Sequence, residues 1–151
     1  MILGKSYLGK FLVVIFLAAF LLSNIHPLIK DYSLSLDDPK AIVLANEKEA
    51  IDWIYSDFVD NESGKKDFNV DVYVPPVIPF AYDYLFAWYG KGRYGKEPVE
   101  KIEPVLYTLY ELDPEHPERL KAWLDRQAGI GKVLKNERFG GIVVQRRERL
   151  K

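Results

Sequence analysis

The sequence predicts an N-terminal transmembrane helix followed by a small α/β sandwich with a mixed, mainly parallel sheet and a C-terminal hairpin. Three observations predict this architecture. An almost entirely apolar stretch lies near the N-terminus of the 151-residue chain. Beyond it, segments with helical spacing alternate with segments of strand character. The last two strand segments are separated only by a short turn that contains glycine. We therefore expect a membrane anchor at 1–30 and an α/β domain at 31–151.

The apolar stretch at 11–29 has the length and composition of a membrane-spanning helix. About 20 mostly apolar residues cross a bilayer as a helix. Phe11–Leu22 contains no polar residue, whereas a helix packed on a soluble domain keeps a polar stripe. Pro27 is expected to bend or end the helix. A cleaved signal peptide is the alternative, but no clear small-residue cleavage site follows the apolar run.

The lysines beside this stretch predict its orientation. Lys5 and Lys10 precede the apolar run, and only Lys30 follows it closely. Positive residues collect on the cytoplasmic side of a spanning helix. We therefore expect a single-pass protein of the cell membrane whose C-terminal domain is extracytoplasmic. Membrane lipid is an expected partner.

The domain is expected to open with a helix and a strand. Asp37 or Asp38 can cap a helix that starts at Pro39, and apolar residues recur at three- and four-residue steps as far as Val59. After a polar loop, Phe68–Val74 alternates: the phenylalanine and the valines point one way, and the polar residues and tyrosine point the other. This pattern is typical of a half-buried strand.

An aromatic helix is expected next, from Pro79 to Tyr89, because prolines end the strand and large rings follow. Rings occur around most of its circumference, so one face cannot bury them all. We expect the sheet side to hold Phe80, Leu85 or Phe86, and their neighbours. The outer side is expected to hold Tyr82, Trp88 and Tyr89. A glycine-rich basic loop at 90–101 should follow.

Three further elements complete the expected order. A strand at Pro104–Leu112 is rich in β-branched, aromatic and other apolar residues. A helix then opens with Asp113 as its cap and Pro114 as its first residue, and it closes at Gly129. Two short strands with a turn around Arg138–Gly141 end the domain.

Composition excludes several function classes. The net charge of -1 argues against a nucleic-acid partner. The absence of cysteine excludes thiol catalysis, disulfides and cysteine-ligated zinc. His26 and His116 lack the spacing of a two-histidine metal motif. No nucleophile or phosphate-loop motif occurs, so we expect no catalytic residues, no metal and no cofactor, and an independent soluble enzyme is disfavoured.

The aromatic helix and the basic segment supply the candidate binding residues. They are Tyr82, Asp83, Tyr84, Trp88, Lys91, Arg93 and Lys96. In one interpretation the helix packs between the sheet and a membrane surface, where tyrosine and tryptophan are favoured. In the other it lines an apolar groove with a polar rim. The lysines and arginine suit anionic headgroups or phosphate.

Four segments carry a resemblance to a known family. They read "SNIHPLIKDYSLSLDDPKAI", "FNVDVYVPPVIPFAYDYLFAWYG", "VLYTLYELDPEHPERLKAWLDRQ" and "ERFGGIVVQRR". From about Leu12 to Arg147 the chain resembles the C-terminal end of bacterial multi-pass glycosyltransferases of the dolichyl-phosphate-mannose/aminoarabinose transferase type. In that family many transmembrane helices precede a small extracytoplasmic domain. The resemblance implies lipid-linked sugar as a ligand and other transmembrane helices as partners.

The resemblance does not extend to the family's catalytic acid, which lies in the first extracytoplasmic loop. That region is absent from this sequence, so no catalytic residue is carried over. We expect a fragment or split subunit of a lipid-linked-sugar glycosyltransferase, which covers or positions substrate without catalytic residues of its own. A free-standing single-pass module for membrane binding or assembly is the alternative.

Overall fold

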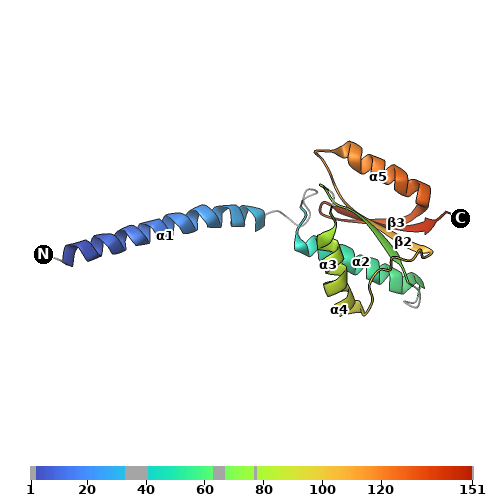
Figure 1. The fold of residues 1–151 in the computed structure, drawn as a ribbon, viewed down its shortest axis with the longest axis horizontal. Helices are drawn as coiled ribbons and strands as arrows, with labels where there is room; N and C mark the ends of the chain where they lie inside the picture. The colour runs from blue at the N-terminus through green and yellow to red at the C-terminus, as the bar shows by residue number, and fades with distance from the viewer. Residues whose placement is uncertain (1–2, 33–40, 63–66, 77, 151) are drawn as a thin grey trace. The chain divides into compact units, whose positions relative to one another are not determined.

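The computed structural model describes residues 3–32, 41–62, 67–76 and 78–150. The chain divides into two compact units, Met1–Ser35 and Leu36–Lys151. The first unit is a helix, and the second is an α/β domain (Figure 1).

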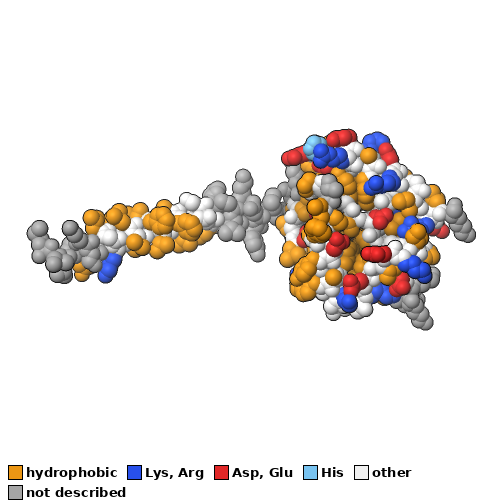
Figure 2. All heavy atoms as spheres, in the orientation of Figure 1, with side chains coloured by type: hydrophobic (Ala, Val, Ile, Leu, Met, Phe, Trp, Pro, Cys, Tyr) orange, Lys and Arg blue, Asp and Glu red, His pale blue; other side chains and the backbone are white. Residues whose placement is uncertain are grey.

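The first unit contains α1, Leu3–Tyr32. Within it, Tyr7–Ile25 is long and apolar enough to cross a membrane, and apolar side chains cover its surface (Figure 2). The helix continues through Pro27, so of the two outcomes expected for this proline, an end of the helix is wrong and a bend stays a prediction. Asn24, a polar residue in the span, donates from Nδ2 to the carbonyl of Phe20 at 2.7 Å, which satisfies part of its polar group within the helix.

The second unit is built on a four-stranded sheet in the order β1-β2-β4-β3. Its strands are β1 (Asn69–Tyr73), β2 (Val105–Glu111), β3 (Gly131–Phe139) and β4 (Ile142–Arg149). The mixed α/β architecture and the C-terminal hairpin are confirmed. The expectation of a mainly parallel sheet is wrong: β1 and β2 are parallel, but β4 is antiparallel to both β2 and β3.

The position of β4 explains this difference. After the crossover through α5, β3 runs in the same direction as β2, but it does not pair with β2. The hairpin instead returns β4 into the space between them, so the two pairs that β4 makes are both antiparallel. Gly140 permits the tight return because its φ is +57°, a left-handed conformation that favours glycine. The predicted turn at Arg138–Gly141 is confirmed.

Helices cover both faces of the sheet (Figure 1). One face carries α2 (Leu44–Glu62) and a continuous helical segment made of α3 (Phe80–Leu85), the π-helical turn η1 (Phe86–Gly90) and α4 (Lys91–Tyr94). The other face carries α5 (Pro117–Ile130). The predicted order of helices and strands in the domain is therefore confirmed.

The main core lies between the sheet and α2 with α3–η1. The alternation expected for the first strand is confirmed, because Phe68, Val70, Val72 and Val74 contact this core while Tyr73 contacts the smaller core beneath α5. The buried residues of the main core are Ala50, Ile51, Ile54, Tyr55, Phe58, Phe68, Tyr82, Leu85, Phe86, Val105, Tyr107, Leu109, Ile142 and Val144.

Several element boundaries differ from expectation. Residues 41–43 are not helical, and α2 begins at Leu44; the residues at 37–40 lie outside the described residues. The segment expected to be a basic loop is helical as far as Tyr94. This helix ends at Gly95, whose φ is +72°. The last helix begins at Pro117 rather than Pro114, because the Asp113 carboxylate accepts a bond from the backbone N–H of His116 at 3.0 Å and forms a separate turn.

Candidate functional site

Four large apolar side chains form an exposed row on the α3–η1 segment and the residue that leads into it. This apolar ridge consists of Ile78, Phe80, Tyr84 and Trp88, which are between 53% and 72% exposed. The three aromatic residues recur at every fourth position, so the helix places them on one face. The rings of Tyr84 and Trp88 stack with centroids 5.8 Å apart. On the domain face shown in Figure 2, apolar side chains gather over α3.

Basic side chains from two helices border the apolar ridge. The ammonium of Lys48, on α2, lies 5.4 Å from the ring centroid of Trp88 and 5.2 Å from that of Tyr89. The guanidinium of Arg93 lies 5.7 Å from the ring of Tyr89. Lys91 is exposed and pairs with Glu97 at 2.5 Å. The ridge is therefore an apolar surface with cations at its margin.

Asp52 fixes the α3–α4 segment against α2. Its two carboxylate oxygens accept bonds from the hydroxyls of Tyr89 at 3.0 Å and Tyr94 at 2.7 Å. Burial, together with the bond to Asp52, raises the pKa of Tyr94 to about 12, so this hydroxyl stays protonated and donates. Arg93 lies 3.8 Å from the same carboxylate. These bonds hold the segment in one rotational position and keep the ridge facing outward.

The predicted orientation of the aromatic helix is right for some residues and wrong for others. Leu85 and Phe86 are buried and Trp88 is exposed, as expected. Phe80, expected on the sheet side, is exposed. Tyr82, expected outside, is fully buried, and its hydroxyl donates to the Glu111 carboxylate at 2.9 Å. The bond to Glu111 offsets the cost of burying the Tyr82 hydroxyl, whereas the exposed Phe80 ring forgoes the gain that burial of an apolar side chain gives.

The structure brings together two of the seven predicted binding residues, Tyr84 and Trp88, whose rings stack. Arg93 instead lies over Tyr89 and beside Asp52, and Lys91 pairs with Glu97. Tyr82 belongs to the core. Lys96 pairs with Asp67 at 3.1 Å and lies over the ring of Phe58, so it stabilises the domain's packing. Asp83 is exposed but lines a different hollow.

That hollow, the edge cleft, runs along the outer edge of β1 and has a volume of about 570 Å³. Its carboxylates come from Asp71, Asp83, Glu97 and Glu100, and Arg149 is the basic residue in its lining. The Arg149 guanidinium already donates to the Glu103 carbonyl and to Asn69. The cleft is therefore acidic.

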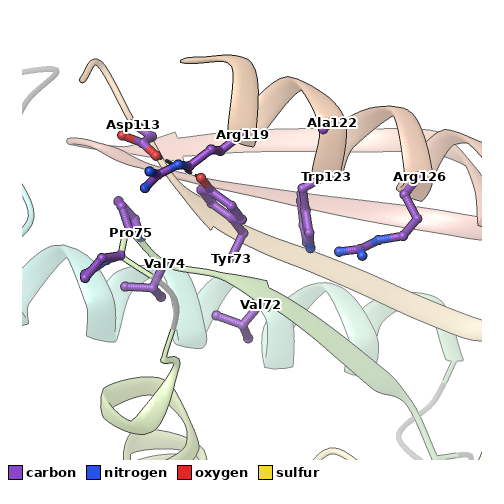
Figure 3. A pocket seen from close by; sticks show the side chains of 10 residues that line it. Val72, Tyr73, Val74, Pro75, Asp113, Arg119, Ala122, Trp123 and Arg126 are labelled. Atoms are coloured by element: carbon purple, nitrogen blue, oxygen red, sulfur yellow. Dashed lines mark hydrogen bonds between the residues drawn. The ribbon is translucent and has the colours of Figure 1, made fainter. Parts of the chain in front are cut away.

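A second hollow, the strand-end cleft, has a volume of about 370 Å³ and lies where β1 ends and α5 begins (Figure 3). Its floor is apolar and aromatic, and two arginines of α5 lie at its side. The lining residues are Val72, Tyr73, Val74, Pro75, Pro76, Asp113, Arg119, Ala122, Trp123 and Arg126. This cleft was not predicted from the sequence, although the spacing Arg119–Trp123–Arg126 places three side chains on one helical face.

Buried charged groups elsewhere have structural partners. The carboxylate of Asp57 accepts from Tyr107 at 2.8 Å and from Lys135 at 2.9 Å, and Arg146 lies 3.6 Å away. Burial raises the pKa of Glu111, which is opposed by the bond from Tyr82. Among the described residues, no group of three or more histidines, aspartates or glutamates is arranged to hold a metal ion.

Comparison with protein-family models, with curated proteins and with solved structures finds no match for this chain. The resemblance to multi-pass glycosyltransferases therefore stays a hypothesis that rests on the sequence segments quoted above. The structure contributes a helix long and apolar enough to span a membrane, an exposed apolar ridge with basic side chains beside it, and two clefts.

Proposed function

We propose that this chain is a single-pass membrane protein whose α/β domain lies against the extracytoplasmic surface of the bilayer through its apolar ridge. The observation that carries the proposal is the exposure of Ile78, Phe80, Tyr84 and Trp88 on a domain joined to an apolar spanning helix. Burying a large apolar side chain is worth roughly 1.5–3 kcal/mol. Tyrosine and tryptophan are also favoured where apolar and wet surroundings meet.

The charges beside the ridge support the same docking mode. Lys48 lies over the Trp88 ring of the ridge, Arg93 lies over the adjacent Tyr89, and Lys91 is exposed on α4. Each cation close to anionic headgroups contributes about 1 kcal/mol. Each of these contributions is small, but α1 tethers the domain, and a tethered second contact needs little intrinsic affinity.

We further propose that the docked domain serves a membrane glycosyltransferase that uses a lipid-linked sugar. The sequence resemblance supports this role. The domain would cover or position substrate, and the transfer itself would be carried out by residues of a multi-span partner. In this proposal Asp83, the predicted binding residue on the edge cleft, does not act as a catalytic acid.

Sidedness is tested by cysteine labelling, since the chain contains no cysteine of its own. A single cysteine at Asp125, an exposed position on α5, should react with a membrane-impermeant maleimide in intact cells. A cysteine at Lys5, before the spanning segment, should react only after the cells are opened. The reverse labelling pattern would contradict an extracytoplasmic domain.

The accessory role is tested with the purified full chain in liposomes. Incubation with lipid-phosphate sugars and candidate acceptors, followed by mass spectrometry, should show no transfer. Transfer that persists in the Asp71→Asn control but is lost in Asp83→Asn would overturn the accessory role and make this chain the enzyme. Both carboxylates line the edge cleft, so the pair separates a catalytic acid from a general effect of cleft charge.

A further inference from the structure

We propose that the strand-end cleft binds a small phosphate ester, with the phosphate on Arg119 and Arg126 and the ester's apolar or ring portion on the floor beside Trp123. This site is separate from the apolar ridge and does not depend on the proposed function. Its position fits a general rule, because ligands of α/β folds bind beyond the carboxyl ends of parallel strands. Tyr73 ends β1, and Asp113 follows β2, the parallel neighbour of β1.

The two arginines supply the anion-binding groups. Both side chains are exposed, and Figure 3 shows them extending from α5 on the same side of the cleft, with Trp123 between them. In the part of the chain that the structure describes, neither guanidinium forms a side-chain hydrogen bond or an ion pair. Arg119 and Arg126 are seven positions apart, and two residues with this separation lie about 10 Å apart along a helix axis. Long arginine side chains can close that separation around one phosphate, a group that guanidinium binds through two parallel hydrogen bonds.

The net charge of the cleft favours an anion. Its lining holds two arginines and one aspartate, which gives 2 − 1 = +1. The aspartate, Asp113, is already engaged: it accepts from the Tyr73 hydroxyl at 2.8 Å and from the His116 N–H at 3.0 Å. Those bonds hold the carboxylate at the rim near Arg119, where Figure 3 shows it beside the Tyr73 ring.

The apolar floor of the cleft predicts that the phosphate is esterified to an apolar or ring-containing group. Val72, Val74, Pro75 and Pro76 contribute apolar surface. The ring of Trp123 packs against Tyr73 and Tyr110 with centroids 5.6 and 5.8 Å away, so it is fixed in place. A preformed apolar wall with a few polar groups at one end is the usual construction of a small-molecule site. Inorganic phosphate alone would leave this wall unused.

The test uses the full chain in uncharged polyoxyethylene micelles, with the Trp123 indole N–H resonance as the reporter. Titration with phenyl phosphate should shift this resonance saturably, and inorganic phosphate should bind at least tenfold more weakly. Arg119→Gln and Arg126→Gln should each weaken binding about tenfold, as expected for loss of a charged hydrogen-bond donor. Lys121→Gln, which removes the same charge from α5 outside the cleft, should leave affinity unchanged.

Three results would overturn the proposal. They are no saturable shift at Trp123, equal weakening by Lys121→Gln, and equal affinities for phenyl phosphate and inorganic phosphate.

Far-UV circular dichroism of the arginine variants checks that folding is intact. A lipid headgroup shares the phosphate monoester chemistry, so the protein is also titrated with dihexanoyl phosphatidic acid. Binding at least tenfold tighter than phenyl phosphate would support the site and identify its ligand as a lipid; weaker binding would support a soluble ester.

Discussion

Replacing Gly90 with alanine tests how the aromatic helix packs on α2. Gly90 is buried in the π-helical turn, and an added Cβ would lie 2.6 Å from the Tyr55 hydroxyl oxygen and 2.8 Å from Cε2 of its ring. The backbone at Gly90 is right-handed helical, with φ −61° and ψ −56°. Alanine can adopt this conformation, so the cost comes from space alone.

Tyr55 cannot easily move away from the added methyl group. Its hydroxyl donates to the Lys96 carbonyl at 2.6 Å, its ring stacks on Tyr94 at 4.4 Å, and its other contacts include the edge of Phe68 at 5.5 Å. Overpacking of such a site costs about 1–3 kcal/mol. Alanine recovers about 0.5–1 kcal/mol over glycine in a helix. We therefore expect Gly90→Ala to lower the free energy of unfolding by up to about 2.5 kcal/mol.

Gly92 provides the matched control, because it lies in α4 and an added Cβ would meet nothing within 4 Å. Gly92→Ala should raise stability by about 0.5–1 kcal/mol. Urea unfolding of the full chain in uncharged micelles, followed by near-UV circular dichroism, compares the two variants. If Gly90→Ala is as stable as Gly92→Ala, Tyr55 does not pack on this turn and the reasoning fails. In a Tyr55→Phe background, loss of the closest contact should reduce the Gly90→Ala penalty.

Three further changes test buried polar groups, each by urea unfolding. Tyr82→Phe should cost about 1–3 kcal/mol, since it removes the donor to the buried Glu111 carboxylate; an unchanged midpoint would contradict the pairing. Because burial raises the pKa of Glu111, the stability this group contributes is present at acid pH and is lost as pH rises through the raised pKa. The free energy of unfolding of Glu111→Gln should therefore rise relative to wild type as pH rises above the ordinary carboxyl range, and parallel pH profiles of the two proteins would refute this. Asp57→Asn should lower the free energy of unfolding by about 2–3 kcal/mol, because Lys135 and Arg146 lose their buried counter-charge. If Asp57→Asn is no more destabilising than Lys135→Met, Asp57 does not hold both cations.

The order of elements could be predicted from the sequence because it depends on local patterns. The alternation of Phe68–Val74 and the glycine turn before the last strand are short-range signals, and each corresponds to an observed element or turn. Pro27 and Pro114 are exceptions, because neither marks the helix boundary expected from it. The position of β4 in the sheet could not be predicted in this way. It depends on which strand edge the returning hairpin meets, and that choice is made by contacts with β2 far away in sequence.

The outward face of the aromatic helix was only partly predictable for a related reason. Rings surround the segment, so apolarity alone does not distinguish Phe80 from Tyr82. The choice depends on Glu111, 29 positions after Tyr82, whose carboxylate accepts the Tyr82 hydroxyl. The strand-end cleft is similar: Arg119 and Arg126 are visible in the sequence as helical neighbours, but the floor they face is supplied by β1.

The central claim, that the apolar ridge contacts the bilayer, is tested most directly by the fluorescence of Trp88. The full chain is placed in anionic vesicles with Trp53 and Trp123 changed to phenylalanine, and lipids brominated near the headgroup serve as quenchers. A second chain that keeps only Trp53, a partly buried residue packed on the main core, is the control. We predict that Trp88 is strongly quenched with blue-shifted emission and that Trp53 is not. Equal, weak quenching of both residues would contradict membrane contact by the ridge.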